Sequence, residues 1–357
     1  MNLNRWCRMV LGVFTGASLW VGSAGAQENW RTTAVPFYSP EQYVQASGRQ
    51  RLADAMQWKA AAATLRSDLQ RWCTGAPAPA VAATALQQEW RAAVTAWDRL
   101  DSIALGPLIE RRSARSVDFM PARAAMLERA ARSGAKDAAE MELVGAPAKG
   151  FEALEWLLWP DVPTPGTPPC GYALSVAEHL QREADAVVPA FGTLAAAEPD
   201  QEQTQAAFAE AVNQWVGGVE RLRWAFMRKP VEVARSRNEA AVFPRQRSGQ
   251  SRDSWAARWS TLRDYAVLGA RATPQATGSE QLIAFETWLR SRGANDLADK
   301  LVLATAQADR AMAQAQPQQP ASVEAAADAL GQLTRLMQAE LAPALNVSIG
   351  FSDADGD

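Results

Sequence analysis

The segment Gly150–Trp159, with the sequence GFEALEWLLW, places two carboxylates on a helix that must be buried. Glu152 and Glu155 are three residues apart, so a helix presents both side chains on one face. Most of the other side chains in the segment are large and apolar, which does not suit a solvated surface. Buried carboxylates are costly unless a proton, a cationic side chain or a metal ion offsets their charge. The segment therefore predicts a buried helix whose carboxylate pair has a compensating partner.

The rest of the chain carries many helix signals and no hairpin signals, which predicts an all-α fold. Ser39–Gln42 forms a capping box with proline at the first helical position. We divide the chain after residue 26 into two halves, 27–198 and 199–357, and expect each to be an antiparallel bundle of about four substantial helices. Similar helical patterns at Trp90–Leu100 and Trp215–Trp224 favour an internal duplication. The expected helices cover 40–72, 83–103, a stretch beginning near 121, 150–159, 170–194, 201–227 (ending at Lys229-Pro230), 251–269, 280–291, 295–314 and 321–341.

The start of the chain, residues 1–26, has the features of a secretory signal peptide. Arg5 and Arg8 give it a positive charge, Met9–Ser23 is apolar and uncharged, and Ala24–Ala26 is a small-residue cleavage site. The alternative is a membrane anchor, which the short and interrupted apolar stretch disfavours. We therefore expect a mature protein that begins at Gln27 and resides in the periplasm or cell envelope.

Two cysteines remain once Cys7 leaves with the signal peptide. In an oxidising compartment we expect Cys73 and Cys170 to form one disulfide, which would close a loop of roughly 100 residues. Two free buried thiols are the alternative. Removal of Arg5 and Arg8 changes the formal charge of the chain from −3 to −5, and this acidic balance argues against a nucleic-acid partner.

Gly150, Glu155 and the final residues Gly350–Asp357 carry a family resemblance. The first two match the signature Gly-x-His-x-x-Glu of the imelysin family of bacterial envelope proteins, whereas Glu152 stands where that family has histidine. The final residues resemble the Gly-Phe-x-Asp-x-Asp-Gly-Asp end of many imelysin-like proteins. The resemblance implies two up-and-down four-helix bundles with the motif helix at a cleft. It also implies a place in the periplasm or on the outer face of the envelope and a link to iron uptake.

The carboxylate pair Glu152 and Glu155 is a candidate metal site. A carboxylate in place of an imidazole makes the ligand set harder and more negative, which favours iron, manganese, calcium or magnesium over zinc or copper. His179 is the one histidine of the chain and would supply an imidazole if its helix runs beside the motif helix; a surface histidine is the alternative. The carboxylates have a second interpretation as ion-paired groups, for which the candidate partners are Arg111, Arg115 and Arg245.

Two further groups of charged residues are candidate binding sites. Arg245 and Arg247 lie in a loop before a helix start, where guanidinium groups suit carboxylate or phosphate, and Arg115 lies in another basic loop. The acidic tail Asp353–Asp357 has the alternating spacing that opens a calcium loop, although the remaining ligands of such a loop are missing. A plain acidic tail is the alternative interpretation.

Three functions are compatible with these features. The leading prediction is an imelysin-like periplasmic protein that binds one metal ion (iron, manganese or calcium), or a metal chelate, in connection with iron uptake. An envelope membrane protein is a further predicted partner. A metallopeptidase is disfavoured because the chain has no His-Glu-x-x-His and one histidine cannot build a His2Glu zinc site. The third prediction is a non-catalytic interaction module that keeps the fold without the metal site.

Overall fold

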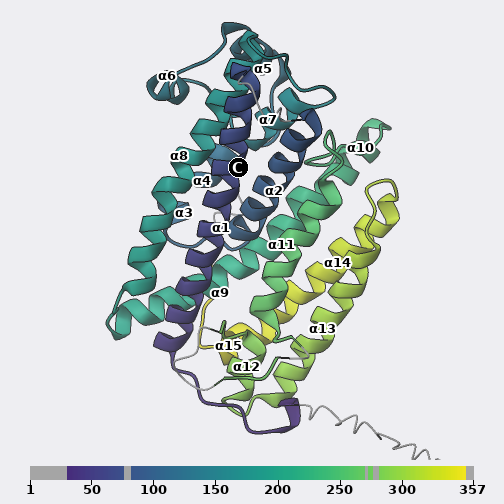
Figure 1. Cartoon of the computed structure of the whole chain (residues 1–357). Coiled ribbons are helices and arrows are strands. Elements are labelled where there is room, and N and C mark those ends of the chain that lie inside the picture. Colours follow the sequence, from purple (N-terminus) through teal and green to yellow (C-terminus); the bar gives the residue numbers. More distant parts are fainter. Residues whose placement is uncertain (1–29, 76–81, 270–271, 276–280, 351–357) are drawn as a thin grey trace, which may run out of the picture.

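The structure is a computed structural model that describes residues 30–75, 82–269, 272–275 and 281–350. Every regular element in these ranges is a helix, which confirms the predicted all-α fold (Figure 1). The predicted signal peptide and the acidic tail after Gly350 lie outside the described residues. Within the described ranges, no helix has the length and apolar character needed to cross a membrane.

The N-terminal helices are arranged around two long helices, α1 (Pro40–Thr74) and α8 (Pro168–Ala196). Helix α1 packs along α8 and also against α2 (Ala83–Asp101) (Figure 1). The predicted capping box is present: Gln42 N donates to Ser39 Oγ at 3.3 Å, and Ser39 N donates to Gln42 Oε1 at 2.9 Å. The shorter elements are η1 (Trp30–Thr32), α3 (Pro107–Glu110), α4 (Ser113–Val117), α5 (Ala124–Ser133), α6 (Ala138–Glu142), η2 (Ala146–Ala148) and α7 (Phe151–Leu158).

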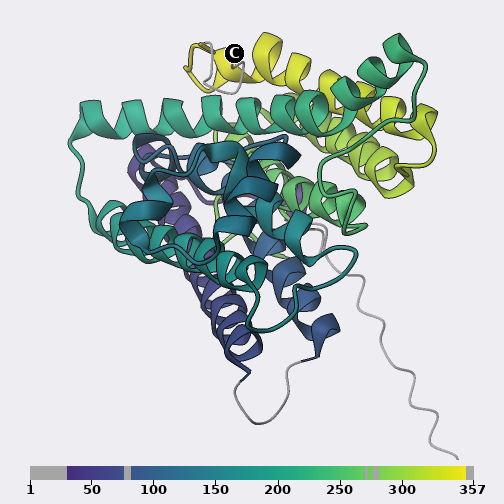
Figure 2. The same ribbon diagram turned by 90° about the horizontal axis from the view of Figure 1, so that it is seen from above.

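The C-terminal helices begin with a continuous rod built from α9 (Gln201–Arg221), the π-helical segment η3 (Leu222–Arg228) and α10 (Lys229–Arg237). Figure 2 shows this rod crossing the molecule in teal and green. The predicted end at Lys229-Pro230 is wrong. The π turn changes the hydrogen-bond register just before Pro230, which then takes a first-turn position of α10, where no N–H is needed. The remaining elements are α11 (Ser251–Ala266), α12 (Phe285–Arg290), α13 (Asn295–Gln314), α14 (Pro320–Leu336), η4 (Met337–Leu341) and α15 (Ala342–Ala344).

One hydrophobic core joins the two groups of helices. Helix α2 packs against α11, and α1 packs against α9, so side chains from both halves of the chain lie in the same cluster. Trp58 of α1 and Trp97 of α2 have ring centroids 4.7 Å apart, and Trp215 of α9 donates its indole N–H to the Leu262 carbonyl of α11 at 2.7 Å. The predicted division after residue 198 falls between α8 and α9, and the core continues across it. The internal duplication stays a prediction.

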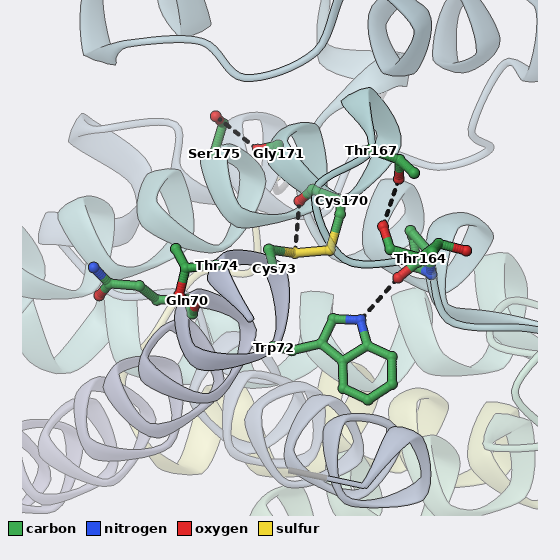
Figure 3. Close-up of a disulfide and its surroundings, with 10 residues drawn as sticks. Gln70, Trp72, Cys73, Thr74, Thr164, Thr167, Cys170, Gly171 and Ser175 are labelled. Atoms are coloured by element: carbon green, nitrogen blue, oxygen red, sulfur yellow. Dashed lines mark hydrogen bonds between the residues drawn. A yellow bond between two sulfur atoms is a disulfide. The ribbon is translucent and has the colours of Figure 1, made fainter. Parts of the chain in front are cut away.

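A disulfide between Cys73 and Cys170 ties the last turn of α1 to the first turn of α8 (Figure 3). Their Cα atoms are 5.5 Å apart, and 97 positions separate them in the sequence. Next to the disulfide, the indole N–H of Trp72 donates to the carbonyl of Pro163 at 2.8 Å. The two long helices that pack most extensively are therefore also linked covalently at one end.

Replacement of Gly218 by alanine is expected to destabilise the fold. A Cβ atom at Gly218 would collide with the carbonyl oxygen of Ser102, where α9 approaches the end of α2. Gly192→Ala is the matched control, because Gly192 is also helical and a Cβ atom there meets nothing within 4 Å. Chemical denaturation should show a loss of about 2 kcal/mol or more for Gly218→Ala and a gain of up to about 1 kcal/mol for the control. Equal stabilities would contradict the close approach of the helices.

Candidate functional site

The motif helix α7 begins after Gly150, whose backbone suits only glycine. Its φ is +84°, and a Cβ atom there would collide with the carbonyl of Val117. Glu155 is buried, with 4% of the residue exposed, and the side chain of Glu152 is 13% exposed. Both carboxylates therefore face protein more than solvent. The apolar side chains are buried as predicted, with no exposed surface at Phe151, Ala153, Leu154 and Leu158.

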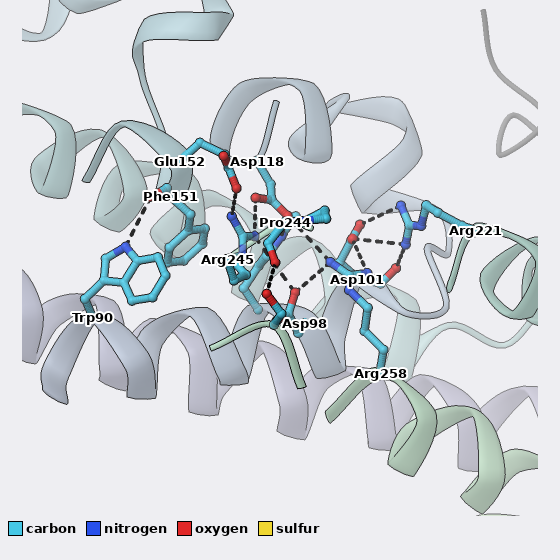
Figure 4. Close-up of polar contacts among 12 residues, drawn as sticks. Trp90, Asp98, Asp101, Asp118, Phe151, Glu152, Arg221, Pro244, Arg245 and Arg258 are labelled. Atoms are coloured by element: carbon cyan, nitrogen blue, oxygen red, sulfur yellow. Dashed lines mark hydrogen bonds and ion pairs between the residues drawn. The ribbon is translucent and has the colours of Figure 1, made fainter. Parts of the chain in front are cut away.

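Glu152 pairs with Arg245, which reaches it from the segment between α10 and α11 (Figure 4). Nη1 of Arg245 lies 2.7 Å from Glu152 Oε1, and Nη2 binds the carboxylate of Asp118 at the end of α4. The Arg245 side chain is fully buried. Arg111, another candidate partner, instead pairs with Glu183 at 2.8 Å. Glu152 is therefore ion-paired, and Arg245 is its partner among the three candidate arginines.

A tight turn before α11 positions Arg245. Arg245 has a φ of 63°, and its carbonyl accepts hydrogen bonds from Gln250 N at 2.9 Å and from Ser248 Oγ at 3.1 Å. Ser248 also binds the second carboxylate of α7: its N–H and its hydroxyl donate to Glu155 Oε1 at 2.7 and 2.6 Å. One turn thus holds both carboxylates of the motif, Glu152 through a guanidinium and Glu155 through a serine.

Further aspartates and arginines extend this contact into a buried cluster, which we name the Arg245 network. Arg258 of α11 lies 2.7 Å from Asp98, 2.9 Å from Asp101 and 3.5 Å from Asp118. Arg221, the last residue of α9, binds Asp101 at 3.0 Å. The network contains four carboxylates and three guanidinium groups, and its members are Asp98, Asp101, Asp118, Glu152, Arg221, Arg245 and Arg258 (Figure 4).

The Arg245 network therefore has one carboxylate more than it has guanidinium groups. Burial raises the pKa of Glu152 to about 7; Arg245 opposes this rise, and the charges of Glu155 and Asp118 add to it. Burial also raises the pKa of Asp118. Negative charge at this site is thus incompletely compensated near neutral pH, and a proton or a bound cation would offset it.

The other predicted site residues lie outside the Arg245 network. Arg115 is exposed, and Arg247 is exposed and donates to the carbonyl of Trp159 at 3.0 Å. His179 is buried on α8, with Nε2 placed 3.1 Å from both the hydroxyl and the carbonyl oxygen of Ser116. Burial lowers the pKa of His179, which favours its neutral form. The imidazole therefore lies between Ser116 of α4 and Glu142 of α6, whose carboxylate is 4.0 Å from its Nδ1.

In the described part of the chain, no group of three or more His, Cys, Asp and Glu side chains is arranged to hold a metal ion. His179 accordingly does not complete a three-ligand set with Glu152 and Glu155. Both glutamates use Oε1 for the contacts given above, and among the described residues Oε2 of either accepts no hydrogen bond. Glu152 and Glu155 therefore offer a cation two carboxylate oxygens, the Oε2 atom of each.

Sequence reasoning missed Asp98, Asp101 and Asp118 as site residues. Asp98 and Asp101 are three residues apart on the apolar helix α2, which is the same signal that marks the pair on α7. Asp118 has no such signal. It belongs to the site because it binds Arg245 and accepts the indole N–H of Trp97 at 2.9 Å, and both contacts depend on the tertiary fold.

Removal of the central guanidinium by Arg245→Gln is expected to cost about 3–5 kcal/mol, because two buried carboxylates lose their main counter-charge. Arg247→Gln is the matched control. Arg247 lies two positions along the same turn, is exposed and loses one hydrogen bond to a carbonyl, so its cost should stay below about 1 kcal/mol. Urea denaturation of both variants measures the difference, and similar losses would argue against the role of Arg245 as the network's counter-charge.

Glu152 is expected to make the stability of the protein fall as pH rises from 4.5 to about 7. The folded state holds a proton on Glu152 in this range and the unfolded state releases it, so ionisation favours unfolding by up to about 3 kcal/mol. Glu152→Gln should therefore flatten the pH dependence of the unfolding free energy across this window. The control is Glu128→Gln on the exposed face of α5, which should keep the wild-type slope. Identical slopes in all three proteins would refute the raised pKa.

Comparison with known proteins places this chain in a family. The imelysin (peptidase M75) family model matches residues 51–355, a range that includes α7 and the whole Arg245 network. The chain is similar to an imelysin-like protein from Psychrobacter arcticum 273-4, with a TM-score of 0.68 and 20% identity over 89% of this chain and 99% of that one.

A second similar structure is a predicted iron-regulated protein A precursor from Parabacteroides distasonis ATCC 8503. It has a TM-score of 0.65 and 12% identity, over 84% of this chain and 94% of that one. A comparison with curated proteins found no match. The family model covers most of the chain and both structures share its fold, so the chain belongs to the imelysin family.

Proposed function

We propose that this protein is an exported, non-catalytic binding protein of the cell envelope that takes up a metal cation at Glu152 and Glu155 in connection with iron uptake. The observation that carries the proposal is the excess of one carboxylate over the guanidinium groups of the Arg245 network. A cation placed beside Glu152 and Glu155 would offset this charge and would lower the pKa of Glu152 from about 7.

The two glutamates suit a metal that brings most of its own ligands. Iron, manganese and calcium prefer oxygen ligands and take six or more of them, whereas the pair offers one free oxygen from each carboxylate. Arg245 also lies against Glu152 and repels a bare cation. A metal chelate avoids both difficulties. The chelator supplies the remaining oxygen ligands of the metal and reduces the positive charge that Arg245 would repel. The proposed cargo is therefore a chelated iron rather than a free ion.

Export and the link to iron are supported by separate observations. The predicted signal peptide and the Cys73–Cys170 disulfide suit an oxidising compartment outside the cytoplasm. One structural neighbour is described as an iron-regulated protein precursor, which supports a link between the present protein and iron. We propose the periplasm as the compartment and an envelope membrane protein as the partner that receives the cargo.

Peptide hydrolysis is not part of the proposal. The single histidine is buried against Ser116, and the chain contains no His-Glu-x-x-His motif, so the pair of histidines that a zinc peptidase site of this kind requires is missing. The second candidate function is an interaction module without metal. It is favoured by the fact that Arg245 and Ser248 already hold one oxygen of each glutamate.

Metal analysis of the mature protein separates these two functions. The protein is incubated with ferric citrate and, separately, with ferrous, manganese, calcium and zinc salts, then passed over a desalting column. We expect about one equivalent of iron from ferric citrate and less retention of the free ions. Glu152→Gln and Glu155→Gln should each weaken binding at least tenfold, whereas Glu128→Gln on the exposed face of α5 should not. No retained metal from any source would reject metal binding and favour the interaction module.

A further inference from the structure

A polar cavity of about 420 Å³ lies where α1, α2 and α11 meet the segment 267–269. Its lining contains cationic, anionic, amide and hydroxyl side chains, and none of these residues belongs to the Arg245 network. We propose that this cavity binds a small zwitterion, a molecule with one carboxylate and one ammonium group such as a free amino acid. The residues that carry the argument are Arg51, Asp54, Arg99, Asp264 and Tyr265.

One wall of the cavity is preformed and carries no net charge. Arg51 is 1% exposed and forms an ion pair with Asp54, one turn along α1. Its guanidinium also lies over the ring of Tyr265, 5.2 Å from the centroid, and the Tyr265 hydroxyl is 3.0 Å from Ser47 Oγ. Because these contacts already hold the side chains in place and pair Arg51 with Asp54, a ligand does not have to neutralise or order them.

The exposed part of the cavity lining carries two opposite charges that are not paired with each other. Arg99 of α2 is exposed, and within the described ranges no hydrogen bond or ion pair holds its guanidinium. Asp264 of α11 has one ion pair, at 3.4 Å with its sequence neighbour Arg263, which itself binds Asp309 at 3.1 Å. Arg99 and Asp264 form no ion pair. Burial raises the pKa of Asp264, and the charges of Arg263 and, to a smaller extent, Arg99 oppose this rise.

This arrangement selects for a ligand that carries both signs of charge. Arg99 can bind a carboxylate, and Asp264 can bind an ammonium group, so a zwitterion placed between them pairs both charges at once. A ligand with a single charge would leave either Arg99 without a partner or Asp264 with only its ion pair to Arg263, and a metal ion would meet Arg51 and Arg99. The volume is at the small end of the range for ligand cavities, which suits a single amino acid.

Isothermal titration calorimetry of the mature protein tests the proposal, with an equimolar mixture of the twenty L-amino acids followed by each one alone. We expect saturable binding of at least one of them. Arg99→Gln and Asp264→Asn should each weaken this binding at least tenfold, because each removes one of the two charge contacts. Both residues are exposed, so the variants should keep the wild-type melting curve. The matched controls are Arg129→Gln and Asp161→Asn, two exposed charges away from the cavity, which should bind as the wild type does.

Three results would overturn the proposal. The first is that no amino acid binds, and the second is that binding is unchanged in Arg99→Gln and Asp264→Asn. The third is equal binding of acetate, butylamine or glucose, since these probes carry a single charge or none. The iron-binding assay on Glu152→Gln and Glu155→Gln uses other residues and another probe, so failure at either site is distinguishable from failure at the other.

Discussion

The buried contact of Arg245 with Glu152 and Asp118 is the interaction on which the arrangement of the site depends. It joins α7 and the end of α4, from the N-terminal half, to the turn before α11 in the C-terminal half. A buried ion pair contributes little net stability, but the loss of one partner leaves an unpaired charge away from water. The contact therefore acts as a constraint on where the two groups of helices can lie relative to each other.

Most helices could be predicted because their signals are local. The start of α1 at Pro40 follows from its capping residues, and the whole of α13, Asn295–Gln314, follows from apolar spacing between breaks. The continuation of the helix past Pro230 could not be predicted. It depends on the π turn of η3, which packs against α14, a helix about 100 residues further along the chain that a local pattern does not reveal.

The site could be predicted only in part. The carboxylates of α7 stand out by their spacing, and the sequence offers Arg245 as one of three candidate arginine partners. The choice among those arginines required the tertiary structure, because 93 positions separate Arg245 from Glu152. Asp118 could not be predicted either, because a single aspartate in a short connection between helices has no periodic pattern.

The close contact between the two halves has a consequence for how ligands arrive. Arg221 of the long rod binds Asp101, Gly218 lies directly against Ser102, and the core is continuous around both contacts. A clam-shell motion, in which two lobes part and close over a ligand, would have to break buried charge pairs and expose that core. The ligands proposed above would therefore approach surfaces that already have their final shape. Their association should follow simple one-step kinetics, governed by diffusion and by the electric field around each opening.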